Sequence, residues 1–161
     1  KTITLKNLPA ADYTSISYTI GVDSLKSTTD ASLRTGVLDV ATNDMYWSWN
    51  SGYIFFKMEG GSSKAFDATK LYKLHIGGFG GKTSGTANNL RTVTLPFGSM
   101  VATVRKNIAP ELHINADISK VFGSSLKLSV ASTIMAPAKG TAVADNYKSM
   151  FALEHIHNDK M

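Results

Sequence analysis

The sequence predicts an all-β fold: an antiparallel Greek-key sandwich of immunoglobulin-like type with one or two short helices. Short runs that alternate apolar and polar residues are separated by turn signals, which is typical of half-buried strands. Glycine, with 13 residues, is abundant together with serine and threonine, and this mixture favours strands joined by turns. No regular alternation of strand and helix patterns occurs, so a parallel sheet is not expected.

The size and composition indicate one domain, which we expect to span residues 1–161. Of these 161 residues, 43% are apolar, which is enough to form a core. The absence of cysteine excludes disulfides, thiolate metal sites and cysteine nucleophiles. The net charge is +5, but the lysines are scattered along the chain, so we expect no nucleic-acid interface. No apolar run is long enough to cross a membrane.

The first part of the chain predicts two paired strands and then a long connection. Residues 2–6 alternate, with Ile3 and Leu5 on one side, and residues 15–22 alternate again. The periodicity is lost from residue 24 to residue 42, where we expect a surface connection that contains one helical turn.

The rest of the chain predicts six more strands and two short helices. The expected strands are residues 53–60, 70–81, 90–97, 100–106, 110–118 and 125–133. A short helix is expected at residues 118–123, closed by Gly123. Apolar residues at helical spacing predict the other helix over residues 143–155, with Asp145 at its N-cap.

Four histidines are candidate metal ligands: His75, His113, His155 and His157. Strand alternation places His75 and His113 on the polar faces of their strands. If the C-terminal Glu-His-Ile-His sequence is extended, both of its imidazoles project to one side, within reach of a single ion. Imidazole nitrogen suits copper, zinc and nickel. The alternative is that these are ordinary surface histidines and that the last two lie in a frayed tail.

No catalytic motif is present, and we expect a protein that is not an enzyme. Glu111 and Asp117 share the predicted polar face with His113, but they do not have the arrangement of a known acid–base pair. There is no Gly-x-Ser-x-Gly sequence, and the glycine cluster at residues 77–81 lacks the lysine and the helix of a phosphate loop.

Both tryptophans, Trp47 and Trp49, lie within the stretch DMYWSWNSGYIFFKMEG, at residues 44–60. Strand alternation places the two indoles on one face. One interpretation is that one indole fills the core while the other lies at its rim. The other interpretations are a platform for stacking a ligand such as a sugar, or a site of oxidative modification, because indole is readily oxidised.

Five segments, taken in order, resemble the MbnP-like family, and the resemblance covers most of the chain. The segments are DMYWSWNSGYIFFKMEG, LHIGGFGG, LRTVTLPF, ELHINADISKVF and MFALEHIH. The family comprises exported bacterial proteins related to a methanobactin-associated protein and to copper-repressible surface proteins. The variant seen here is most similar to members of Bacteroidetes type. Those members carry an earlier strand region, so we expect the present chain to lack its N-terminal strands.

The resemblance implies an exported, non-catalytic copper-binding protein of the periplasm or cell surface, anchored as an outer-membrane lipoprotein. In relatives, histidine nitrogens hold copper beside a kynurenine, which a di-haem partner of MauG type forms from tryptophan. Trp47 or Trp49 would be the modified residue, although no Trp-x-His sequence of the kind found at that site occurs in this chain. The alternative is an immunoglobulin-like accessory module that docks on an outer-membrane protein complex or a polymer.

Overall fold

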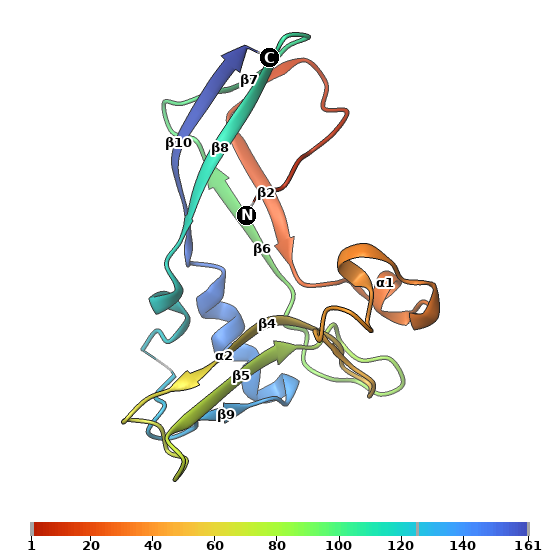
Figure 1. The fold of residues 1–161 in the computed structure, drawn as a ribbon, viewed down its shortest axis with the longest axis vertical. Helices are drawn as coiled ribbons and strands as arrows, with labels where there is room; N and C mark the ends of the chain where they lie inside the picture. Colours follow the sequence, from red (N-terminus) through yellow and green to blue (C-terminus); the bar gives the residue numbers. More distant parts are fainter. Residues whose placement is uncertain (1, 125, 161) are drawn as a thin grey trace.

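The computed structural model describes residues 2–124 and 126–160, and within this part the chain is built mainly of short strands (Figure 1). The strands are β1 (Ala11–Tyr13), β2 (Ser15–Ile20), β3 (Tyr46–Trp47), β4 (Gly52–Gly61), β5 (Leu71–Gly77), β6 (Arg91–Pro96), β7 (Ala102–Val104), β8 (Ile108–Ala116), β9 (Thr133–Ile134) and β10 (Phe151–Lys160). The α-helices are α1 (Ser24–Thr28) and α2 (Pro137–Tyr147), and the 3-10 segments are η1 (Ala31–Leu33), η2 (Gly36–Leu38) and η3 (Ile118–Val121). The prediction of an all-β fold with short helices is confirmed.

Strand pairing is antiparallel in all but one of the described pairs. β1 pairs with β7, β2 with β6, and β8 with β10. The largest sheet has the order β3-β4-β5-β9, in which β5 and β9 run parallel. Figure 1 shows the β2–β6 and β8–β10 pairs at one end of the elongated molecule, and β4, β5, β9 and α2 at the other. These antiparallel layers are consistent with a sandwich.

The main core lies between the β4–β5 sheet and helix α2. Leu74 and Ile76 of β5 are buried against Val143 and Tyr147 of the helix. The helix approaches the strand closely at Gly140, where a Cβ atom would lie 3.2 Å from the Ile76 side chain. Glycine therefore sets the distance between helix and sheet at this point.

Buried polar groups fix the connection between β5 and β6. The side chain of Asn89 is fully buried, and its Nδ2 donates to the carbonyl oxygens of Gly77 and Pro137, each at 2.8 Å. The Tyr147 hydroxyl donates in turn to the Asn89 carbonyl. These bonds tie the end of β5 and the start of α2 to the same loop.

Two strand predictions are wrong. Residues 2–10 form no strand, and Ile3 and Leu5 are exposed. The expected pairing with residues 15–22 does not occur, because β2 pairs with β6 and no described strand pairs with residues 2–10. Of the strand expected at residues 125–133, Ser125 lies outside the described residues, residues 126–132 form loops and a turn, and only Thr133 is in a strand, at the start of β9. Leu126 still fills the core, but it does so from a loop.

The C-terminal helix prediction is wrong in its boundaries. Helix α2 starts at Pro137, because proline is well tolerated in the first turn, where no backbone N–H bond is lost. Asp145 lies inside the helix, where it pairs with Arg91 at 2.8 Å. Residues Phe151–Lys160 form the strand β10. No helix in the described ranges is long and apolar enough to cross a membrane.

Candidate metal centre

Strands β8 and β10 form a two-stranded antiparallel ribbon that carries three of the four histidines (Figure 1). His113 comes from β8, and His155 and His157 come from β10. In the register of the ribbon His155 lies directly opposite His113. The final histidines therefore belong to a paired strand and not to a frayed tail.

A β-bulge between Leu153 and His155 brings the histidines onto one face. Leu153 lies opposite Ile114, yet His155, two residues later, lies opposite His113, so that Glu154 is the extra residue. In a ladder without the bulge, His155 would face Leu112 and share the apolar face, because directly opposed residues project to the same side. Bulges re-aim side chains in this way. The bulge thus creates the histidine cluster.

The three imidazoles, which we call the histidine trio, are in mutual contact. The rings of His113 and His155 stack with centroids 4.1 Å apart and an interplanar angle of 18°. The His157 ring stands nearly perpendicular to both, with centroids 5.2 Å from His113 and 4.7 Å from His155. One potential ligand nitrogen from each residue lies within 4.8 Å of the other two. His113 and His155 are half-buried, whereas His157 is exposed.

This donor set fits a transition-metal ion. Imidazole nitrogens bind zinc at about 2.0–2.1 Å, so two ligands of one such ion lie about 3 to 4 Å apart. The trio is close to that spacing, and small rotations of the side chains would complete it. Three imidazoles suit copper and zinc, and a shallow site on a ribbon leaves a coordination position open.

Glu111 lies on the same face as the trio. It is the cross-strand neighbour of His157, and its Oε1 atom is 3.6 Å from Nε2 of His113. Its side chain is 65% exposed and can therefore turn toward an ion above the ribbon. Sequence alternation already placed Glu111 beside His113, but it did not place either residue beside the C-terminal histidines.

His75 lies apart from the trio, on β5 in the large sheet. It is buried, although alternation predicted a polar face, because both faces of this sheet are covered near the end of β5. Its Nε2 lies 2.6 Å from Oε1 of Glu59. The hydrogen bond to His75 holds the pKa of the Glu59 carboxyl below its usual range. His75 is therefore engaged in a side-chain pair within the sheet.

The tryptophans lie at the β3 edge of the large sheet. Trp47 of β3 is 4% exposed and fills the core, whereas Trp49 is 52% exposed and lies in the turn that follows β3. Their rings stack with centroids 5.2 Å apart at 20°. Trp47, with Trp49 stacked on it, thus belongs to a different sheet from the histidine trio.

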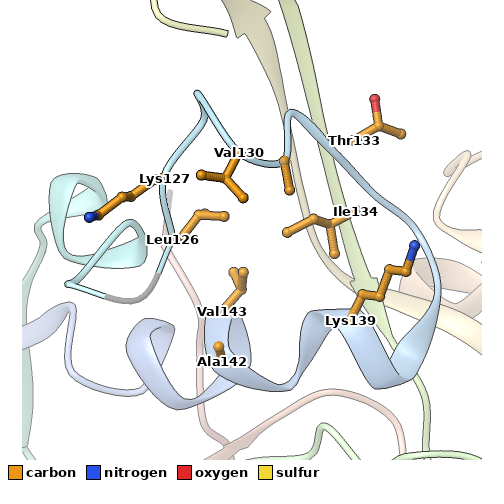
Figure 2. Close-up of a pocket in the computed structure, with 9 residues that line it drawn as sticks. Leu126, Lys127, Val130, Thr133, Ile134, Lys139, Ala142 and Val143 are labelled. Carbon is orange, nitrogen blue, oxygen red and sulfur yellow. The ribbon is translucent and has the colours of Figure 1, made fainter. Parts of the chain in front are cut away.

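A shallow groove of about 400 Å³ lies between α2 and the segment that leads into β9 (Figure 2). Its lining is mostly apolar and includes Leu126, Val130, Ile134 and Val143, with Lys127 and Lys139 beside it. The lining contains no histidine and no carboxylate, so the groove offers no acid–base pair.

The chain matches the model of the family described as MbnP over residues 1–137. This range includes His75, His113 and both tryptophans, but it ends before His155 and His157. No curated protein and no solved structure matches the chain. Because the matched range covers most of the 161 residues, the chain belongs to the MbnP family.

Proposed function

We propose that this protein binds copper in the bacterial cell envelope without catalysing a reaction, and that His113, His155 and His157 are its ligands. The contact of three imidazoles on one face of the β8–β10 ribbon carries this proposal. Membership of the MbnP family supports it, since that family suggests a methanobactin-associated role.

The chemistry of the trio favours copper among the first-row divalent metals. For a given set of nitrogen and oxygen ligands, affinity rises from manganese to copper and falls again at zinc. The exposed His157 keeps the site open to solvent, so an ion can exchange with a carrier or a small ligand. Such an open surface site suits the transfer or storage of copper.

The location and the modification remain part of the proposal. We place the protein in the periplasm or at the cell surface, attached as an outer-membrane lipoprotein. If a di-haem partner of MauG type oxidises a tryptophan to kynurenine, Trp49 is the accessible substrate, because Trp47 is buried beneath it. A kynurenine at residue 49 would lie beside β3, which belongs to a different sheet from the trio, and would not be a ligand of this site.

Copper titration of the purified protein tests the proposal. We expect one copper per chain, and we expect His113→Ala, His155→Ala and His157→Ala each to weaken binding by at least about tenfold, which is the lower end of the loss found for supporting residues. His75→Ala is the matched control and should leave the affinity unchanged. Absence of binding at micromolar copper, or a loss confined to His75→Ala, would refute the proposal.

A docking module is the second candidate function. The connection between β2 and β3 exposes three large apolar side chains, because Leu25, Leu33 and Val37 are 73%, 78% and 82% exposed. Large exposed apolar groups are a feature of interaction surfaces. Cross-linking in envelope fractions would test this function: a Leu33→Asp, Val37→Asp variant should lose a cross-link to an outer-membrane protein that His113→Ala retains.

A further inference from the structure

The face of the ribbon that bears the trio carries a fourth donor, the carboxylate of Glu111. Directly opposed residues of an antiparallel pair project to the same side, and Glu111 lies opposite His157. Its Oε1 atom is 3.6 Å from Nε2 of His113, which is the separation of two ligands that share one ion. Residues 111, 113, 155 and 157 therefore form a block of two cross-strand pairs.

We propose that Glu111 is the fourth ligand of this site, and that it makes the site select Cu(II) over Cu(I). This inference rests on the proposed function, because it concerns the same ion. The resulting donor set is three imidazole nitrogens and one carboxylate oxygen.

The charge and hardness of the carboxylate give the selectivity. A negative oxygen attracts a divalent ion about twice as strongly as a monovalent ion at the same distance. A tetragonal set of nitrogen and oxygen ligands is the arrangement typical of Cu(II), whereas Cu(I) is selected by soft sulfur donors. None of the residues 111, 113, 155 and 157 carries a sulfur atom, so the block itself supplies no such donor.

Glu111 is free to take this role. It forms no ion pair with a lysine or arginine of residues 2–124 and 126–159, and its ion pair there is with His113. The exposure of its side chain allows it to rotate toward an ion without disturbing the core.

A different role for Glu111 would be to orient the His113 ring without touching the ion. Carboxylates commonly act in this way on metal-bound histidines. A residue that only orients the ring would lower the affinities for both ions, because both use the same imidazole, and it would leave the ligand atoms of Cu(II) unchanged. A direct ligand affects mainly Cu(II), so the two roles differ in a measurable ratio.

The test measures the affinities of the full chain for Cu(II) and, under anaerobic reducing conditions, for Cu(I), using competing chelators. We expect Glu111→Gln to weaken Cu(II) binding by about tenfold to a hundredfold and to change the Cu(II) electron paramagnetic resonance spectrum, which reports the ligand atoms. Cu(I) binding should change by less than about threefold. Asp159→Asn is the matched control, because it removes an equal charge two residues beyond His157 on β10 and should change neither affinity appreciably.

The outcomes separate this inference from the proposed function. If wild type binds copper, and Glu111→Gln has no effect or weakens Cu(I) and Cu(II) equally, the role of Glu111 as an ion-selecting ligand is wrong while copper binding stands. If Asp159→Asn matches Glu111→Gln, the effect is one of general charge, and the inference is also wrong. If wild type binds neither ion, the proposed function fails, and this inference fails with it. Circular dichroism of each variant checks that the fold is retained.

Discussion

Binding of one copper ion to the histidine trio should fasten β10 to β8. The donors come from both strands, so the ribbon cannot open without releasing the ion. A ligand that binds only the closed form raises the free energy of opening by RT ln(1 + [L]/Kd), which is about 2.7 kcal/mol when free copper is 100 times Kd. Amide exchange that requires opening of the ribbon should therefore slow by about 100-fold.

Hydrogen exchange followed by mass spectrometry gives the measurement. The slower exchange should extend over the ladder that runs from Phe151 opposite Ala116 to Asn158 opposite Pro110. Helix α1 is an internal control, because it is a single turn, exposed except at Ser27, that is distant from the ribbon in sequence, and its local opening does not involve the trio. Its rates should change by less than about twofold.

Two results would refute the reasoning. One is a chain with one bound copper in which β8 and β10 exchange as fast as without metal. The other is a copper-induced slowing of amide exchange in β8 and β10 that is as large in the His113→Ala variant as in wild type, since this would place the ion elsewhere. His75→Ala, in contrast, should show the wild-type response.

Three further predictions concern the core. Tyr147→Phe should lower the free energy of unfolding by about 1–3 kcal/mol in urea denaturation, because the buried Asn89 carbonyl loses its donor. Burial raises the pKa of Tyr147 to about 12, above the usual value of about 10. The neutral phenol therefore stabilises the fold below pH 10, and this contribution is lost as the pH rises toward 12. Thermal melts over this pH range should show a smaller loss of stability in Tyr147→Phe than in wild type. Trp47→Ala should cost about 3–5 kcal/mol in the same urea assay and Trp49→Ala about 1 kcal/mol or less, and equal losses would contradict their different burial.

Strands that are buried on one side were predictable from sequence. In β6, Val93 and Leu95 are buried while Thr92 and Thr94 are exposed, which is the alternation seen in the sequence. A pleated strand on a core imposes this pattern directly, because successive side chains project to opposite faces. The residues themselves therefore report the strand and its orientation.

Strands that depend on a distant partner were not predictable. Residues 2–6 alternate as clearly as β2, but alternation states only that a segment could cover a core, and Ile3 remains exposed. Conversely, the short β9 has no alternation to detect, and it exists because Thr133 and Ile134 lie beside Lys73 and Leu74 of β5. The identity of the partner is a property of the whole chain and not of the local sequence.

In the candidate site, one strand, β10, shows both a feature that was predictable from the sequence and one that was not. Phe151 and Leu153 predict that odd-numbered residues of β10 face the core, which would turn His155 inward, yet the next apolar residue is Ile156, an even-numbered one. This change of phase marks the bulge at Glu154, and it is visible in the sequence. The pairing of β10 with β8, which places His155 opposite His113, is not visible there. The local sequence thus indicates that the two C-terminal histidines project away from the core. The pairing of β10 with β8 adds the third imidazole, from His113, and the carboxylate of Glu111 to the candidate metal site.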